Sequence, residues 1–470
     1  MQFDVIAMGG GFAGMITACR AAELGLKAAV LEQKSEDRYA CNSRYTSGVS
    51  QVMGKYMLSP PEELVEAIMT GTDGTARREL AQAMAQHSSR AVGWLRQQGA
   101  RILDQPTTDG RRLILAPPRR FIEGLDWEGR GGDALLRQLQ ENLLRLGGQL
   151  IRSCHVEALV VKDGCCIGVD AMQGDRRVRY EARAVAIADG GFPANVSMVQ
   201  RYICSRPERV LARSAPGNRG EGIAMAEAIG AATGGFGGFY GHLHHRDAMT
   251  NNRLWPYPHF DAVAEVSMLV GPDGRRFTDE GLGGVCMTNA VAHLDDPLSA
   301  TIIFDDAMWA GEAGKEGPVG PNPYLMSGGG WMHSADDLQG LAQKAGLPVA
   351  ALTQTVREYN ESVREKRLEG LRPARRVRRA RPAPIEKPPF HAVPLCAGIT
   401  GTMGGVEINP NAQALRPDRS AIPGLYVVGT PISGLEGGPR AGYVGGLSKA
   451  FVFGLIAAEH IAASAAGGSP

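Results

Sequence analysis

The sequence lacks several features that would place it in common classes of protein. Its 8 cysteines form no Cys-x-x-Cys pair and no cysteine–histidine spacing typical of zinc ligands, so neither a zinc site nor a disulfide framework is predicted. Neither sign of charge dominates, since 50 Lys and Arg residues accompany 49 Asp and Glu residues. A chain this close to neutral argues against broad binding to nucleic acid or to an anionic membrane.

Long apolar runs are also scarce. The longest, Ala450 to Ala458, is about half of what an α-helix needs to cross a bilayer, and it contains Gly454. The chain opens with a strand pattern from Phe3 and without the basic, apolar and small-residue regions of a secretory signal. We therefore expect a cytoplasmic protein with no transmembrane segment, whose 44% of hydrophobic residues can form a sizeable core.

Glycine is the residue that the sequence has in excess. It supplies 62 of 470 residues, about 13% against a typical value of about 7%. The glycines cluster in pairs and triplets without a fixed period, which excludes a collagen-like repeat. Such clusters mark tight turns and places where the backbone approaches a ligand closely. A phosphate-bearing cofactor is the ligand we expect.

A glycine-rich βαβ unit opens the chain. A strand over residues 4–8 leads into a G-x-G-x-x-G motif, a helix to about residue 24 and a second strand over residues 27–31. Gly9 makes the turn, Gly11 admits a pyrophosphate to the backbone, and Gly14 lets the helix pack on the strand. The helix N-terminus favours the negative charge of the pyrophosphate.

The residue after the second strand indicates which dinucleotides fit. Glu32 can accept both ribose hydroxyls of an adenosine, and its charge disfavours the 2′-phosphate of NADP. FAD and NAD share the glycine motif, so the βαβ unit alone leaves both open.

Composition along the chain predicts a second domain in the middle. Residues 241–385 alternate turn-rich stretches with helical patterns and are expected to form a capping or substrate domain. Residues 1–240 and 386–470 are expected to form the dinucleotide-binding domain. A basic run, Arg372 to Arg381, lies near the second boundary. It suits either a patch for a partner or nucleic acid or a solvated loop between domains, and the near-neutral chain favours the loop.

Six further motifs lie in order along the chain. They are CNSRYTSG at 41–48, ADGGF at 188–192, GEG at 220–222, GRRFTDE at 274–280, TMGGV at 402–406 and PGLYVVG at 423–429. Together they resemble the motifs of the superfamily of FAD-dependent fumarate reductases, succinate dehydrogenases and 3-ketosteroid dehydrogenases. Within it, the chain is most similar to the tricarballylate dehydrogenase branch.

The resemblance implies an α/β fold in which a Rossmann-like FAD-binding domain, built from both chain ends, carries an inserted α+β capping domain. No nearby His or Cys marks a covalent link, so the FAD is expected to be non-covalent. A helix N-terminus at residues 445–447 would face the flavin pyrimidine and stabilise the reduced form. The residues assigned to FAD are Gly9, Gly11, Ala13, Gly14, Glu32, Gln33, Asn42, Ser43, Thr46, Ser47, Gly48, Ala188, Gly190, Gly429, Thr430, Gly445, Gly446 and Leu447.

The resemblance also implies hydride transfer between the flavin and a carbon close to a carboxylate or ketone. Such a site needs a cation or hydrogen-bond donor on that group and an acid or base for the second proton. Arg440 lies near the place where fumarate reductases carry a substrate-binding arginine, and Tyr443 lies near the catalytic tyrosine of ketosteroid dehydrogenases. Arginine suits a carboxylate because it binds in a bidentate manner.

A histidine cluster supplies the other catalytic candidates. His242, His244 and His245 lie where the chain enters the expected cap, close to the position of a substrate histidine in fumarate reductases. We choose His244 and His245, with His259 and Tyr257 as weaker candidates. No carboxylate or cysteine accompanies the cluster at a useful spacing, so no metal site is predicted.

Two departures from the family argue against fumarate reduction. Gly284 stands where fumarate reductases carry a proton-donating arginine, and Gly401 stands where they carry a histidine. The expected reaction is therefore desaturation of a C–C bond next to a carboxylate, with a tricarballylate-like polycarboxylate favoured as substrate. The chain carries no haem or cysteine-rich motif, so a separate electron acceptor is expected.

Three alternatives to this reaction stay open. A ketosteroid-type dehydrogenase of a cyclic ketone would use Tyr443 as its base. An ene reductase of the fumarate-reductase type would run the reaction in reverse. A flavin-binding redox partner or sensor would have no small substrate of its own.

Overall fold

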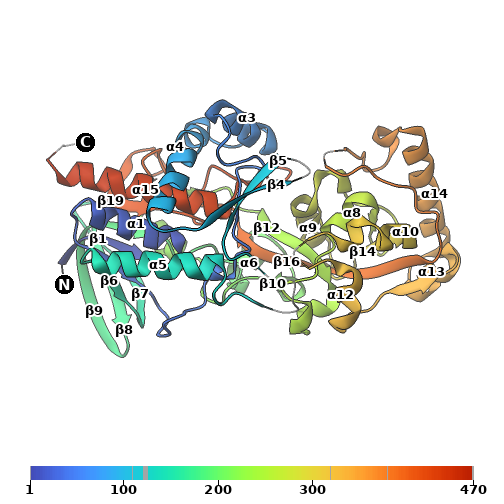
Figure 1. Cartoon of the computed structure of the whole chain (residues 1–470), viewed down its shortest axis with the longest axis horizontal. Helices are drawn as coiled ribbons and strands as arrows, with labels where there is room; N and C mark the ends of the chain where they lie inside the picture. The colour runs from blue at the N-terminus through green and yellow to red at the C-terminus, as the bar shows by residue number, and fades with distance from the viewer. Residues whose placement is uncertain (1, 108–109, 120–124, 318, 378, 468–470) are drawn as a thin grey trace.

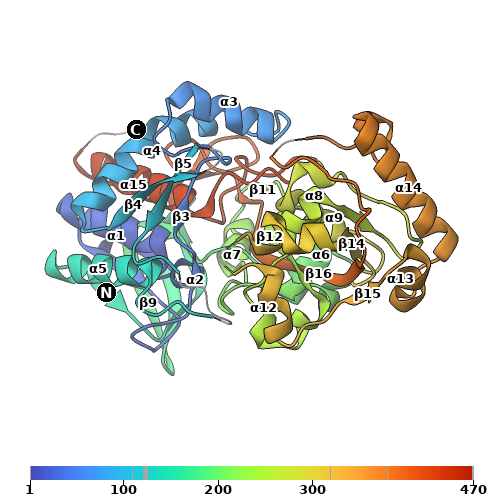
Figure 2. The same cartoon turned by 45° about the vertical axis from the view of Figure 1, so that its right-hand side comes forward.

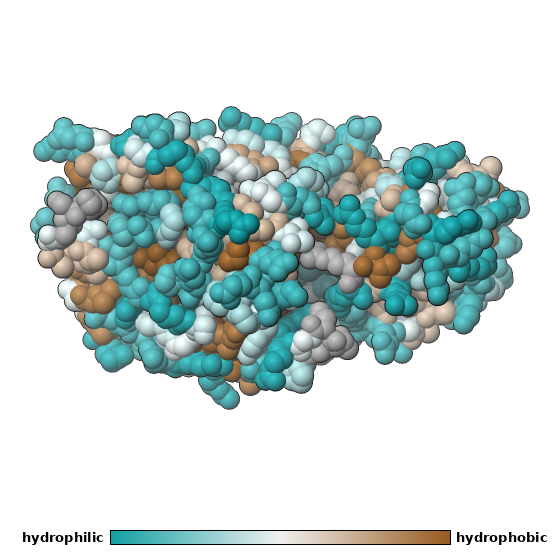
Figure 3. Space-filling model, turned by 90° about the horizontal axis from the view of Figure 1, so that it is seen from above, coloured by the Kyte–Doolittle hydropathy of each residue, from teal (hydrophilic) through white to brown (hydrophobic). Residues whose placement is uncertain are grey.

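The computed structural model describes residues 2–107, 110–119, 125–317, 319–377 and 379–467 as two lobes side by side (Figure 1). Both termini lie in the first lobe, and the two outer helices α13 and α14 close the far end of the second (Figures 1 and 2). The face in Figure 3 is mostly hydrophilic, with apolar residues in small separate groups.

The first lobe is built on a mostly parallel sheet with strand order β18-β19-β9-β1-β2-β6. Its strands are β1 (Gln2–Met8), β2 (Ala28–Leu31), β6 (Gln149–Ile151), β9 (Arg176–Ile187), β18 (Gln413–Leu415) and β19 (Ala421–Val427). An antiparallel meander, β7 (Cys154–Lys162) and β8 (Cys165–Gln173), extends the sheet from β9. β1 is buried along most of its length, as expected of a central parallel strand.

Helices cover this sheet and its surroundings. They are α1 (Phe12–Glu23), α2 (Asn42–Tyr45), α3 (Pro61–Gly71), α4 (Arg78–Gln97), α5 (Gly131–Arg145), α6 (Val196–Tyr202), α7 (Glu221–Ala228) and α15 (Gly446–Ala465). Small sheets are formed by β3 (Val49–Ser50), β4 (Ile102–Thr107) and β5 (Gly110–Leu115), and by β11 (Thr233–Gly234) and β17 (Gly405–Val406). α1 packs between α15 and α5.

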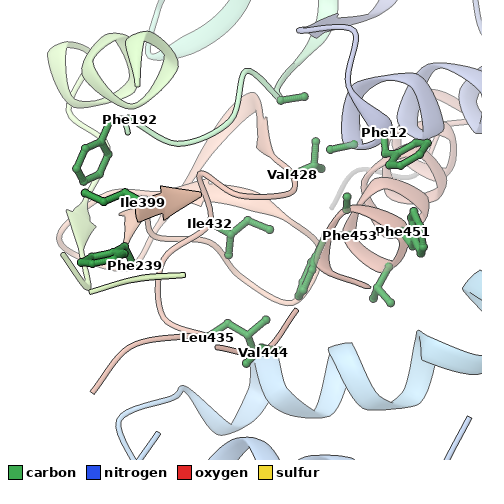
Figure 4. Close-up of a cluster of buried hydrophobic side chains, with 14 of the residues drawn as sticks. Phe12, Phe192, Phe239, Ile399, Val428, Ile432, Leu435, Val444, Phe451 and Phe453 are labelled. Carbon is green, nitrogen blue, oxygen red and sulfur yellow. The ribbon is translucent and has the colours of Figure 1, made fainter. Parts of the chain in front are cut away.

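The core of the first lobe joins segments from the two ends of the chain. Phe12 of α1 and Phe451 of α15 meet edge to face, with ring centroids 5.6 Å apart, among Val428 and Phe453 (Figure 4). Among the described residues, only α15 is long and apolar enough to pass a test for a membrane span, and 67% of its most apolar window is buried inside the protein. Its apolar character is therefore accounted for by packing in this core.

The second lobe surrounds one long strand. β16 (Phe390–Thr402) pairs with β10 (Leu211–Ala212), β12 (Phe239–His245), β14 (Thr301–Asp305) and β15 (His333–Ala335), and β13 (Met268–Val270) pairs with β14. The helices around this sheet are α8 (Asp261–Val266), α9 (Gly284–Ala292), α10 (Asp306–Ala310), α11 (Glu312–Lys315), α12 (Pro321–Ser327), α13 (Leu338–Ala345) and α14 (Val349–Glu365).

The expected domain boundaries cut through this second sheet. A boundary between residues 240 and 241 divides β12, and a boundary at residue 385 separates β16 from β14, β15 and most of β12, while β10 stays on the same side as β16. We propose instead that the cap begins with β12 and includes β16 up to Thr402. The mixed α/β architecture itself is confirmed, as are the βαβ unit at residues 2–31 and the meander at 154–187.

Two arginines of the basic run, Arg375 and Arg379, form ion pairs within the protein. Arg375 is 3% exposed and lies 3.4 Å from the buried carboxylate of Glu280. Arg379 forms an ion pair with Glu316. Because these two arginines are already paired, the run favours the loop between domains over a patch for a partner.

Candidate active site

A large cavity lies where the two lobes meet. It encloses about 1770 Å³ of empty space, counting the part open to solvent. Its walls come from the β1–α1 turn, the segment at 40–47, the end of β9, β12, β16 and the start of α15.

The β1–α1 turn has the geometry that a pyrophosphate needs. Gly9 has a φ of +105°, and a Cβ there would lie 2.8 Å from the carbonyl oxygen of Ala188. A Cβ on Gly14 would lie 2.1 Å from the carbonyl oxygen of Gly9. The N-cap residue of α1 is Gly11, and Ser43 Oγ accepts a hydrogen bond from the first helical amide, that of Phe12, at 2.9 Å. Close backbone packing and the other amides of this helix N-terminus fit the phosphates of a dinucleotide.

Glu32 lies beside this turn and is 7% exposed. One carboxylate oxygen accepts a hydrogen bond from the amide of Gly10 at 3.0 Å, and the other accepts one from the amide of Lys34 at 2.9 Å. Burial raises the pKa of Glu32 above its ordinary value, although these amides act in the opposite direction. Each oxygen retains a further lone pair, so the carboxylate can still receive ribose hydroxyls.

All but three of the residues predicted to bind FAD line the cavity. The three are glycines that shape the walls from behind: Gly14, Gly48 and Gly445. Gly48 and Gly445 have positive φ values of +87° and +131°, which favour glycine. The residues assigned to FAD therefore lie together around one cavity, and their contact with FAD stays a prediction.

The start of α15 contains an ion pair that sequence reasoning missed. Glu436 accepts hydrogen bonds from the amides of Val444 at 2.9 Å and Gly445 at 3.2 Å, and it pairs with Lys449. Both side chains are buried and line the cavity. A lysine within an otherwise apolar helix was the available signal.

Arg440 does not line the cavity, so the prediction that it contacts the substrate is not supported by its position. Its Nε donates to a carboxylate oxygen of Asp73 at 2.6 Å, and its Nη2 donates to the carbonyl oxygen of Thr70 at 3.0 Å. Asp73 and Thr70 thus hold this guanidinium at the edge of α3, and the Arg440 side chain remains 28% exposed.

His244 and His245 are also absent from the cavity wall. The two rings are buried: His244 lies 3.2 Å from the carbonyl oxygen of Pro258, and His245 lies 2.9 Å from that of Trp331. Burial lowers the pKa of each imidazole. β12 runs from the cavity into the cap, so a residue two positions further along lies about 7 Å deeper.

His242 is the histidine of the cluster that lines the cavity. Its Nε2 lies 2.9 Å from the hydroxyl of Tyr240, and its Nδ1 lies 2.5 Å from a carboxylate oxygen of Asp261. The ring of His259 stacks on His242 with centroids 4.4 Å apart and planes 10° apart. Asp261 also accepts a hydrogen bond from the amide of Leu243 at 2.9 Å.

The charge balance around Asp261 follows from these contacts. Burial raises its pKa, but His242, His259 and the hydrogen bonds outweigh burial and hold the pKa well below its ordinary value. Burial and the neighbouring His242 lower the pKa of His259 to about 3.

The same three groups offer ligand atoms within 4.8 Å of one another, as a metal site does. A metal ion binds an imidazole nitrogen along its lone pair, in the plane of the ring. The rings of His242 and His259 are stacked and nearly parallel, so one ion cannot lie in both ring planes. This geometry fits a hydrogen-bonded pair of His242 and Asp261 better than a metal site.

Tyr443 lines the cavity, as its prediction requires. Its ring stacks on Tyr240 with centroids 4.0 Å apart, and its hydroxyl oxygen accepts a hydrogen bond from the amide of Gly446 at 2.6 Å. Burial raises the pKa of Tyr443 well above its ordinary value. A neutral phenol at the helix start can still donate its proton to a ligand.

Arg213 is the cation of the cavity wall that sequence reasoning missed. Its guanidinium donates to the carbonyl oxygen of Pro256 at 3.1 Å and to the hydroxyl of Thr400 at 2.8 Å, and it is 9% exposed. No carboxylate pairs with it among the residues that the structure describes. Its loop carries no motif that could have identified Arg213 from the sequence.

Comparison with known proteins identifies the family. A family model described as an FAD binding domain matches residues 4–443. The chain is 26% identical over 475 residues to an NADH:fumarate oxidoreductase of Klebsiella pneumoniae, covering 99% of this chain and 48% of that protein. It is 28% identical over 379 residues to a 3-oxosteroid 1-dehydrogenase of Mycolicibacterium smegmatis, covering 71% and 63%. The chain thus spans about half of the length of the first relative.

Solved structures support the same fold. The 3-ketosteroid delta1-dehydrogenase of Sterolibacterium denitrificans superposes with a TM-score of 0.77 at 20% identity, covering 98% of this chain and 100% of that chain. A flavocytochrome c3 fumarate reductase gives a TM-score of 0.70 at 22% identity, covering 99% and 79%. With the cavity described above, these findings show that the chain belongs to the FAD binding domain family of oxidoreductases and has FAD as its cofactor.

Proposed function

We propose that the protein is an FAD-dependent oxidoreductase acting on CH–CH groups, which desaturates a C–C bond next to a carboxylate. A polycarboxylate similar to tricarballylate is the favoured substrate. The relatives named above act on fumarate and 3-oxosteroids, so they support the reaction class without fixing the substrate. The cytoplasmic location stays a prediction.

The proposed preference for a carboxylate substrate rests on the position of Arg213 in the cavity wall. A buried guanidinium that has only neutral acceptors leaves its charge uncompensated, and an anionic substrate would compensate it. Charge-assisted, bidentate hydrogen bonds from arginine suit the planar carboxylate group.

One further donor of the cavity wall supports additional contacts to substrate oxygens. Trp255 lines the cavity, and its Nε1 is buried and has no hydrogen-bond partner within the described part of the chain. Buried donors are rarely left without an acceptor, so a substrate oxygen is the expected partner of this indole.

Two glycines bear on the direction of the reaction and on the size of the substrate. A Cβ on Gly284 would lie 2.2 Å from Asp261 Oδ2, so the arginine of fumarate reductases has no room at this position. A Cβ on Gly401, which lines the cavity, would meet nothing within 4 Å. These observations favour a bulkier substrate than fumarate and argue against the ene reductase.

The glycine turn after β1, Glu32 and the start of α15 would hold FAD, which would supply a hydride acceptor for the β-hydrogen. Arg213 would hold the carboxylate, and the phenols and imidazole at the cavity would take the α-proton. The expected electron acceptor is a separate molecule. The cyclic-ketone dehydrogenase remains the second candidate, because the hydroxyl of Tyr443 suits a ketone oxygen.

An anaerobic titration of the FAD-loaded protein tests this proposal. Tricarballylate is expected to bleach the flavin absorbance, whereas a cyclic ketone is not. Arg213→Gln should weaken half-saturation by tricarballylate by about 10- to 100-fold, since a hydrogen bond to a charged group contributes about 1.5–3 kcal/mol. Arg440→Gln is the matched control and should leave the titration unchanged. Bleaching by the ketone alone would contradict the carboxylate proposal.

A further inference from the structure

A chain of hydrogen bonds leads from the cavity into the cap. Tyr240 and His242 line the cavity, and Asp261 lies behind them at the start of α8. The hydroxyl of Tyr240 lies 2.9 Å from Nε2 of His242, whose Nδ1 lies 2.5 Å from Asp261 Oδ2. Both imidazole nitrogens are therefore engaged, one toward the cavity and one toward a carboxylate.

We infer that Tyr240 is the catalytic acid–base residue of the proposed reaction and that His242 and Asp261 relay its proton. The inference rests on the proposed function, which supplies the substrate proton to be removed. His242 and Asp261 act through Tyr240 and are positioning residues.

The tyrosine needs this relay because a neutral phenol is a weak base. Burial raises the pKa of Tyr240 to about 12, so the hydroxyl keeps its proton at neutral pH. It can accept a carbon-bound proton only while it passes its own proton to a neighbour. His242 is within hydrogen-bond distance and Asp261 would stabilise the imidazolium that results.

The proton transfer balances as follows. The α-C–H bond of the substrate breaks and its proton bonds to Tyr240 Oη, while the phenolic O–H bond breaks and that proton bonds to His242 Nε2. The proton on Nδ1 stays between the ring and Asp261. The electron pair of the α-C–H bond forms the new C=C bond as the β-hydrogen leaves as hydride to FAD.

The surrounding residues fix the relay in place. The Tyr443 ring stacks on Tyr240, and the His259 ring stacks on His242. A side chain on Gly284 would collide with Asp261, so glycine leaves room for this carboxylate. Other charged or titratable groups also face the relay: Arg213, His244, Tyr257, Glu265 and Arg379.

The first test is the rate of flavin reduction by tricarballylate in anaerobic stopped flow of the FAD-loaded enzyme. Tyr240→Phe keeps the ring stack and removes the hydroxyl, and it should slow reduction by about 10²- to 10⁴-fold. Half-saturation by tricarballylate should change little, because Arg213 is intact. The matched control, Tyr56→Phe, removes an exposed hydroxyl of the first lobe and should leave the rate unchanged. A Tyr240→Phe enzyme with the wild-type rate would overturn the inference.

The second test asks whether Asp261 acts through His242. In Asp261→Asn the imidazolium loses its counter-ion, so the acid limb of the rate profile should shift to lower pH and the maximal rate should fall. A merely structural residue would lower the rate without moving that limb. An unshifted limb would therefore overturn the relay.

A third measurement needs no substrate. The short contact between His242 and Asp261 should give a low-field exchangeable proton in the NMR spectrum of the FAD-loaded protein. The resonance should vanish in His242→Gln and in Asp261→Asn and persist in His259→Gln. If tricarballylate and ketones all fail to reduce the wild-type flavin, the proposed function fails, whereas a resonance unaffected by Asp261→Asn overturns the relay itself.

Discussion

At the scale of single residues, the site depends on a few buried polar groups whose charges are set by their neighbours. Arg213 is a cation with neutral partners, Asp261 is a carboxylate between two imidazoles, and Asp189 is a carboxylate with little compensation. These three groups have different consequences for the protein. The first two suit a bound anion and a proton relay, and the third predicts a dependence on pH.

Asp189 gives the clearest prediction for pH. Its Oδ2 accepts a hydrogen bond from the amide of Gly222 at 2.7 Å, but its buried Oδ1 has no partner among the described residues. Burial raises its pKa from 3.8 to about 7. The folded state thus keeps the proton up to about pH 7 and the unfolded state loses it near 3.8, so stability falls as pH rises through this window.

Asp189→Asn should therefore raise the melting temperature more at about pH 8 than at about pH 5, because only part of the wild-type penalty is present at the lower pH. Thermal unfolding at the two pH values measures this. Asp295→Asn, at an exposed position, is the control and should show no such difference. A stabilisation that is equal at both pH values would contradict the role assigned to burial.

Gly284 gives a prediction about packing. Gly284→Ala would bring a Cβ to 2.2 Å from Asp261 Oδ2, which must then move away from His242. We expect the free energy of unfolding to fall by about 1–3 kcal/mol, as for other overpacked sites, together with slower flavin reduction. Gly370→Ala, where a Cβ meets nothing within 4 Å, should change neither the melting temperature nor the rate.

At the scale of elements, the start of α15 depends on one buried ion pair. Glu436 holds the amides of Val444 and Gly445, and Lys449 neutralises it. Lys449→Met would leave a buried carboxylate alone, which typically costs about 3–5 kcal/mol. We expect a lower melting temperature and weaker FAD retention, both measurable by thermal unfolding and flavin release.

The double variant Glu436→Gln, Lys449→Met should recover most of the lost stability, because no charge is then left unpaired. If it were no more stable than Lys449→Met, the lysine would contribute through packing alone.

Elements that form from neighbouring residues could be predicted from the sequence. The βαβ unit with its turn from β1 to α1 follows from local patterns of glycine and apolar residues, whereas most of the residues assigned to FAD were given by the resemblance of motifs to a family. β16 could not be assigned to its sheet, because its partners lie 55 to 187 residues away by the pairings Ala335 with Phe390 and Leu211 with Gly398. Long-range pairing leaves no trace in a single sequence.

The catalytic side chains were harder to predict for the same reason. One histidine of the predicted cluster, His242, reaches the cavity, and which histidine does so depends on how β12 lies against β16. Tyr240 was not singled out, and Arg213 belongs to a loop without a motif. Motif spacing predicted that Arg440 contacts the substrate. In the structure its guanidinium instead binds Asp73, which belongs to a distant segment of the chain.

At the scale of the whole molecule, the two lobes supply different parts of the cavity wall. The first lobe holds the glycine turns, Glu32 and the start of α15, which suit FAD. The second lobe contributes β12 and the end of β16, which bring Tyr240, His242 and Thr400 to the cavity. Under the proposed function the groups that contact the substrate come from the lobe opposite the cofactor, so the reaction would require both lobes to be in contact.

The most direct test of the central claim is a single-turnover experiment with FAD-loaded enzyme and tricarballylate under anaerobic conditions. Mass spectrometry of the quenched mixture would measure the product formed for each flavin that is bleached. The proposed function predicts one aconitate, the substrate less two hydrogens, for each reduced flavin. A flavin that stays oxidised with tricarballylate, yet is rapidly reoxidised by fumarate after reduction with dithionite, would contradict it.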